Sequence, residues 1–208
     1  MELQYFGANC IRITTKKSTI VVDDNLGKLG LKAITKPTDI SLRTSKDFPE
    51  AKEAYFKAEM PGEYEVGGFI IHGVAARAHM DKEDETNTVI YTITAGDVKA
   101  VVLGHIYPDL SEEQVEQIGP IDVAVVPIGG NGYTLDGVGA LKVIKKIDPN
   151  IVIPTHYADK SIKYEVPQSD LAEGLKGLAM EPTETVARYK VKPADFGTSA
   201  HLIVLERS

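Results

Sequence analysis

Three of the five histidines in the sequence stand in loops that follow apolar segments, where side chains are free to contact a substrate or a metal. His105 and His156 come shortly after the runs Val98–Leu103 and Ile151–Ile153, and His79 stands in a third loop of this kind. An imidazole can ligate a metal or act as a general base near neutral pH. These three residues are therefore the first candidates for a functional site.

A carboxylate ends another apolar run, because Asp23 directly follows Ile20–Val22. Polar residues just beyond strand ends are favoured site positions in layered α/β proteins. Asp23 is thus a catalytic candidate together with His105 and His156, with the role of orienting one of the imidazoles. The alternative is a loop carboxylate that only accepts hydrogen bonds from the backbone.

The elements that position these residues alternate between strands and a few helices. β-rich segments predict strands over 3–6, 10–13, 18–22, 39–42, 69–72, 89–94, 98–103, 121–128, 151–153, 189–191 and 201–206. Helices are predicted over 50–57, from the capping box at Ser111 and Gln114 to about 118, over 135–147, and from a cap at Ser169 to about 180. The pattern predicts one α/β domain over residues 1–208.

Length and composition exclude several classes of protein. The 208 residues are 43% hydrophobic and 25% charged, which is typical of a globular domain. The formal charge of −7 speaks against a nucleic-acid partner, and no apolar run reaches the roughly 20 residues that span a bilayer. The first residues do not resemble a secretory signal, and the single Cys10 excludes an internal disulfide. We therefore expect a soluble cytoplasmic protein, with self-association left open and a small molecule as the expected partner.

Several motifs occur in a consistent order over roughly residues 1 to 160: Tyr5-Phe6-Gly7, Ile20–Asp23, Gly62–Val66, Pro127–Gly130 and Ile151–Tyr157. In this order they resemble the metallo-β-lactamase superfamily, specifically its short branch of metal-dependent hydrolases akin to L-ascorbate-6-phosphate lactonase. The resemblance implies an αβ/βα sandwich, in which two mixed β-sheets pack face to face and helices lie outside. It also implies hydrolysis of a lactone, ester or phosphoester.

The metal-binding motif of that family is changed in this sequence. Family members carry His-x-His-x-Asp-His, in which histidines two residues apart bind one zinc and the Asp-His pair binds a second. Aligned without gaps from Thr44, these four ligand positions hold Ser45, Asp47, Pro49 and Glu50. Neutral serine is a poor zinc ligand, and proline has no side-chain donor.

The remaining ligand positions of the family fall on His79, His105 and His156, with an uncertainty of one residue at His79. His105 replaces the aspartate whose carboxylate bridges both metals, whereas His156 stands in an unchanged motif. An imidazole ligates one metal through one nitrogen and cannot bridge two. We therefore expect the ordinary two-zinc site to be absent.

Three hypotheses of function remain. In the first, the chain binds no cofactor and is a non-catalytic protein that binds a small ligand or an anion. In the second, one zinc or another divalent ion is held in a rebuilt hydrolytic site by His79, His105 and His156 with Asp47 or Glu50. In the third, hydrolysis proceeds without metal, with His105 or His156 as general base and Asp23 orienting it.

A glycine-rich segment, Gly129–Gly132, stands between a predicted strand and a predicted helix. It lacks the spacing and the Gly-Lys-Ser/Thr ending of a nucleotide-binding P-loop. An anion site at the following helix N-terminus is the functional alternative to a plain turn.

Overall fold

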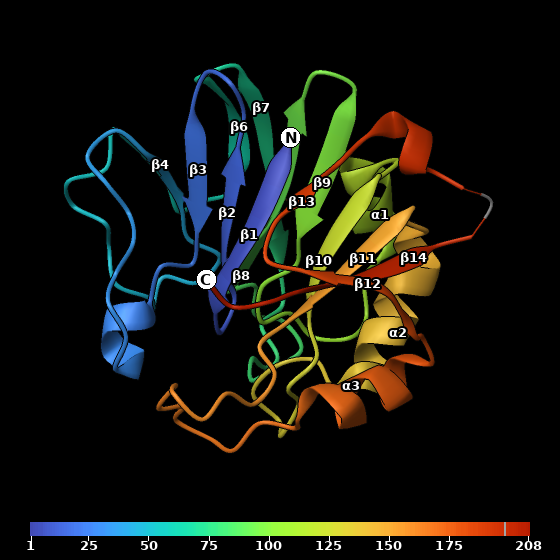
Figure 1. Ribbon diagram of the computed structural model, residues 1–208. Coiled ribbons are helices and arrows are strands. Elements are labelled where there is room, and N and C mark those ends of the chain that lie inside the picture. Colours follow the sequence, from blue (N-terminus) through green and yellow to red (C-terminus); the bar gives the residue numbers. More distant parts are fainter. Residues whose placement is uncertain (198) are drawn as a thin grey trace.

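The computed structural model, which describes residues 1–197 and 199–208, consists of two β-sheets packed face to face with helices outside (Figure 1). This arrangement confirms the predicted αβ/βα sandwich. The first sheet has the strand order β13 (Tyr189–Lys190), β1 (Glu2–Gly7), β2 (Cys10–Thr14), β3 (Thr19–Val22), β4 (Ile40–Leu42) and β5 (Phe56–Ala58).

The second sheet is larger and mixed. Its strand order is β12 (Pro182–Val186), β14 (His201–Leu205), β11 (Ile151–Thr155), β10 (Val123–Pro127), β9 (Val98–Val102), β8 (Thr88–Ala95), β7 (Phe69–Ala76) and β6 (Gly62–Val66). Strands β9, β10, β11 and β14 run parallel, whereas β6 to β9 form an antiparallel meander. Strands β8 and β9 are joined by a tight hairpin, in which Ala95 pairs with Val98.

Three α-helices lie against the outer face of the larger sheet (Figure 1): α1 (Glu112–Ile118), α2 (Gly137–Ile147) and α3 (Leu171–Leu178). Two short 3₁₀ helices, η1 (Leu26–Leu29) and η2 (Pro193–Asp195), lie outside this layer. The predicted capping box of α1 is present, with the Ser111 hydroxyl accepting from the Gln114 amide. None of the helices in the described residues has the length and apolar character of a membrane span.

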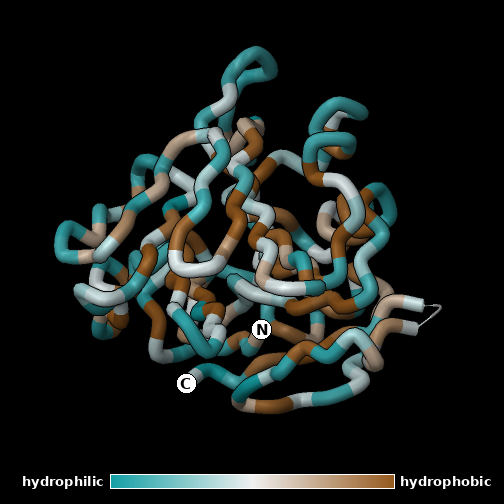
Figure 2. The backbone as a smooth tube through the Cα atoms, turned by 90° about the horizontal axis from the view of Figure 1, so that it is seen from above, coloured by the Kyte–Doolittle hydropathy of each residue, from teal (hydrophilic) through white to brown (hydrophobic). Residues whose placement is uncertain are grey.

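The core has two layers, one between the sheets and one between the larger sheet and the helices. Strand β10 contributes to both, since Val123 and Val125 face the other sheet while Ala124 and Val126 face the helices. This double burial explains the unbroken apolar run, as expected for a parallel strand covered on both faces. Apolar segments lie mostly inside the molecule and hydrophilic ones mostly in its outer loops (Figure 2).

Two sequence predictions of elements are wrong, and some strands were not predicted. Residues 50–57 form turns and then β5, because Phe56–Ala58 pairs in parallel with β4, and this sheet pairing overrides local helix propensity. Helix α3 is capped by Asp170, whose side chain accepts from the Glu173 amide, and not by Ser169. Strand β12 was not predicted, because it is a largely exposed edge strand of polar character.

Candidate functional site

The structure brings His79, His105 and His156 together where β7, β9 and β11 end. The rings of His105 and His156 are nearly perpendicular, with centroids 4.5 Å apart. The backbone amide of His79 donates to the carbonyl of His105 at 2.8 Å. His105 is only 7% exposed and His156 only 2%, so the cluster is an interior feature of the strand ends.

Local backbone geometry fixes two of these histidines. Gly104 has φ +62°, and a Cβ at this position would lie 2.7 Å from the Thr44 side chain, so only glycine fits before His105. His156 itself has φ +56°, and its amide donates to the carbonyl of Ala8 at 2.7 Å. A non-glycine residue held in this left-handed region costs free energy, and such strain concentrates at functional sites.

Aromatic rings surround the two buried histidines. The ring centroids of Phe48 and Tyr133 lie 5.3 and 4.9 Å from that of His105, both edge-on. Tyr164 lies 5.1 Å from His156. The immediate surroundings of the imidazoles are therefore largely aromatic.

Gln168 determines which nitrogen of His156 carries a proton. The Gln168 amide nitrogen donates to the carbonyl of Val166 at 2.9 Å, so its Oε1 faces His156 Nδ1 at 3.1 Å. Since Oε1 only accepts, Nδ1 must donate, and the neutral ring keeps its lone pair on Nε2. Burial lowers the pKa of His156 to about 4, which keeps this ring neutral near pH 7.

Two nitrogen atoms of the cluster are buried without a partner: His105 Nε2 and His79 Nδ1 have no hydrogen bond to any described residue. Burial, and then the neighbouring His156 and His79, lowers the pKa of His105 well below its usual range. An unsatisfied buried polar atom is costly, and its presence in a protein points to a water, an ion or a ligand.

A cavity of about 120 Å³ adjoins these histidines. Its walls include Asp47, Phe48, His79, His105 and Tyr133. The combination of aromatic rings with carboxylate and hydroxyl groups in its lining suits a small polar molecule.

Asp23 belongs to a separate buried network below this cavity. Its Oδ1 accepts from the Thr44 amide at 2.7 Å, and its Oδ2 accepts from the Thr44 hydroxyl and the Asn9 amide nitrogen at 2.7 and 2.8 Å. Asn9 in turn accepts from the Thr155 hydroxyl at 2.7 Å. Burial raises the pKa of Asp23 from 3.8 to about 6, against the opposing effect of these hydrogen bonds.

The hydrogen bonds of Asp23 correct the prediction that it orients a histidine. All the hydrogen bonds of its carboxylate that are found in the described residues come from Thr44 and Asn9. The alternative interpretation, a carboxylate that accepts from the backbone at a strand end, agrees with its bond to the Thr44 amide. Asp23 therefore ties together the strand ends beneath the site.

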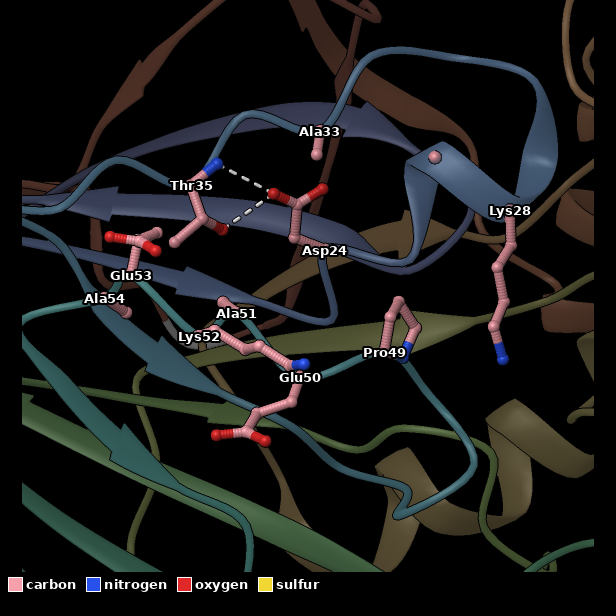
Figure 3. Close-up of a pocket in the computed structure, with 11 residues that line it drawn as sticks. Asp24, Lys28, Ala33, Thr35, Pro49, Glu50, Ala51, Lys52, Glu53 and Ala54 are labelled. Carbon is pink, nitrogen blue, oxygen red and sulfur yellow. Dashed lines mark hydrogen bonds between the residues drawn. The ribbon is translucent and has the colours of Figure 1, made fainter.

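The two other carboxylate candidates lie in different cavities. Asp47 lines the histidine cavity, whereas Glu50 lines a second cavity of about 430 Å³ together with Pro49 and Asp24 (Figure 3). Glu50 is paired there with Lys57 at 2.6 Å. The prediction that Glu50 joins the histidines is wrong, because the segment after Phe48 turns toward the second cavity.

The sequence profile of the β-lactamase superfamily domain matches residues 2–156, about three quarters of the chain. The chain belongs to this superfamily. A UPF0173 metal-dependent hydrolase of Nanoarchaeum equitans is 32% identical over 124 residues, which cover 58% of this chain and 46% of that protein. One from Thermoplasma acidophilum is 46% identical over 48 residues, 22% of this chain and 21% of that protein. The matched segments thus span less than half of these relatives.

Solved structures of the superfamily show the same fold. A proposed Zn-dependent hydrolase from Thermotoga maritima has a TM-score of 0.75 at 22% identity, covering 99% of this chain and 98% of that one. The metallo hydrolase Igni18 from Ignicoccus hospitalis has a TM-score of 0.65 at 20% identity, covering 99% and 95%. At these identities the likeness establishes the fold of this superfamily member.

The residues of this superfamily member do not fit a metal in their present arrangement. Within residues 1–197 and 199–208, no three side chains of histidine, cysteine, aspartate or glutamate are grouped so that they could hold an ion. The side chains predicted for a rebuilt site therefore do not form such a group in this arrangement, although the three histidines lie near one another: His79, His105, His156, Asp47 and Glu50.

The glycine-rich segment Gly129–Gly132 allows close packing against neighbouring residues. Gly129 has no room for a side chain, because a Cβ there would collide with the His156 carbonyl and with Gln168. The N-terminus of α2 is capped by its own carboxylate, since Asp136 accepts from the Gly139 amide at 2.7 Å. The anion site considered from the sequence would need the place that Asp136 occupies.

Sequence reasoning missed four contributors to the site: Phe48, Tyr133, Tyr164 and Gln168. Tyr133 stands three residues after the Pro127–Gly130 motif and could have been suggested by its position. The others stand in irregular loops without any motif, so only the folded chain relates them to the histidines.

Proposed function

We propose that this superfamily member is a small-molecule-binding protein that does not carry out two-metal hydrolysis. Its ligand site is the cavity beside His79 and His105, and the neighbouring Asp23 network is its scaffold. The protein thereby keeps the position of the superfamily's active site while its chemistry differs.

One observation carries this proposal: the rings of Phe48 and Tyr133 lie against His105, the residue that stands in place of the bridging aspartate. A two-metal site needs a shared anionic ligand and space for two cations at this point. An aromatic environment around a neutral imidazole supplies neither. It supplies apolar walls with a few polar groups, which is the usual composition of a small-molecule site.

Elemental analysis of protein purified without chelator, and again after dialysis against zinc and manganese, tests the proposal. We expect well below one metal ion per chain, and no hydrolysis of nitrocefin or bis-p-nitrophenyl phosphate beyond that of a His105→Ala, His156→Ala double variant. One or two tightly bound equivalents per chain, with turnover lost on chelation, would contradict it.

A binding screen tests directly whether the protein binds a small molecule. A ligand that binds only the folded state raises the melting temperature, by an amount that grows with its concentration. We expect such stabilisation by small polar metabolites without their turnover, and its loss when Ser45→Phe fills the cavity. Stabilisation that persists in this variant would place the ligand site elsewhere.

A further inference from the structure

We propose that the histidine cavity binds a small organic cation, such as an amidinium or a primary ammonium group, with the Asp47 carboxylate as its counter-ion. This inference rests on the proposed function and specifies the chemical class of its ligand. It departs from an anion site, which the sequence left open.

The charges in the cavity wall favour a cation. Asp47 and Asp81 both line the cavity, and no lysine or arginine does so among the described residues. Both carboxylate oxygens of Asp81 already accept hydrogen bonds, from the Ala78 amide at 2.8 Å and from the backbone and side-chain amides of Asn87 at 3.0 Å. Asp81 therefore contributes negative potential while most of its acceptor capacity is used within the protein.

The Asp47 carboxylate is the acceptor that remains. Its backbone amide donates to the Ser45 hydroxyl and its carbonyl accepts from Lys28, but no hydrogen bond or ion pair engages its carboxylate in the described part of the chain. Burial, followed by the charges of Glu165 and Asp47, raises the pKa of Tyr133, so the field of Asp47 reaches this cavity wall. The neighbouring Lys46 donates to the side chain of Asn87.

The rest of the wall complements a flat or compact cation. Phe48 and Tyr133 supply aromatic rings, whose faces attract cations. His105, which is 93% buried and has an unpartnered ring nitrogen, supplies a polar group that no protein atom satisfies. The cavity volume corresponds to about four water molecules, which is enough for a group of roughly four heavy atoms.

Three small molecules of similar shape but different charge distinguish the effect of charge on binding from the effect of shape: acetamidinium, acetamide and acetate. Their binding is measured by calorimetry and by amide chemical-shift changes in ¹⁵N-labelled protein. We expect acetamidinium to bind at least about tenfold more tightly than acetamide, a difference of ~1.4 kcal/mol. Acetate is expected to bind most weakly, and the shifts to centre on residues 45–48 and 78–81.

Two variants of the same loop sharpen the test. Asp47→Asn should reduce acetamidinium binding to the level of acetamide and leave acetamide unchanged. Glu50→Gln, which removes a carboxylate from a residue that lines the other cavity (Figure 3), should leave all three affinities unchanged.

The outcomes distinguish this inference from the proposed function. Acetamide or acetate binding as tightly as acetamidinium would overturn the cation preference and leave the small-molecule site standing. An equal loss in both variants would overturn the role of Asp47 and indicate a general surface effect. Failure of all three probes to bind, in a protein that retains stoichiometric metal, would overturn both proposals.

Discussion

Two buried polar clusters lie side by side at the strand ends, and they differ in how well they are satisfied. In the Asp23 network, both carboxylate oxygens and the facing groups of Asn9 and Thr44 have hydrogen-bond partners. In the histidine cluster, one nitrogen each of His79 and His105 has none. A satisfied buried network contributes rigidity, whereas unsatisfied groups are retained when something else binds them. The comparison favours a structural role for the first cluster and supports the proposal that the second binds a ligand.

The comparison of the two clusters predicts the largest loss of stability for Asp23→Ala. This change leaves the Thr44 and Asn9 donors buried without an acceptor, so the free energy of unfolding should fall by about 3 to 5 kcal/mol. Chemical denaturation measures it. The matched control is Asp24→Ala, because Asp24 accepts as many hydrogen bonds, from Ile34 and Thr35, in a less buried place. An equal or greater loss in the control would contradict the special role of Asp23.

The two clusters also predict opposite pH dependences. Folded Asp23 holds its proton up to about pH 6, while the unfolded carboxyl releases it near 3.8, so this group favours the folded state below 3.8 and loses that contribution as pH rises to 6. His156 titrates near 4 when folded and near 6.5 when unfolded, so its contribution is lost as pH falls from 6.5 to 4. His105 acts in the same direction as His156.

Replacing Asp23 should reveal the pH dependence of stability that the histidines alone produce. The wild-type stability should rise from pH 4 to 6 with a reduced slope, because Asp23 opposes the histidines. Asp23→Asn should steepen that rise, by up to about 3 kcal/mol across the window. Denaturation midpoints at half-unit pH intervals measure the slope. A shallower slope in the variant would show that the sign assigned to Asp23 is wrong.

A smaller effect on stability is expected when the hydrogen bond that fixes the tautomer of His156 is removed. Gln168→Leu removes the acceptor at Nδ1 and should cost about 1 kcal/mol of stability. The ¹⁵N shifts of the His156 ring should change from a fixed pattern, with Nδ1 protonated, to a mixture of tautomers. Gln168→Glu, which keeps an acceptor, should restore the fixed pattern. A wild-type ring protonated at Nε2 would contradict the assignment.

The smallest effect on stability is predicted for His105→Leu. The substitution removes an unpartnered buried nitrogen and keeps an apolar side chain of similar length, so the free energy of unfolding should change by less than about 1 kcal/mol. Binding of acetamidinium should nevertheless fall. A stability loss as large as that of Asp23→Ala would place His105 in the scaffold.

Much of this arrangement could be predicted from sequence, and its failures have physical causes. The α/β character of the domain and the choice of His79, His105 and His156 as candidates followed from apolar runs that end in polar residues, whereas the sandwich was implied by the resemblance to the metallo-β-lactamase superfamily. Glu50 was misplaced because an ungapped alignment does not show where a loop turns. Gln168 and Phe48 could not be predicted, since their contacts with the histidines depend on irregular loops and on no periodic pattern.

The account is tested most directly by anomalous diffraction at the zinc edge, from crystals of the wild-type protein grown with zinc present and then soaked in acetamidinium. The predicted result is no anomalous peak among His79, His105 and His156, and difference density for a small molecule beside Asp47 and Tyr133. An anomalous peak ligated by these histidines, with the cavity empty of the probe, would contradict the claim that this site binds an organic ligand in place of metal.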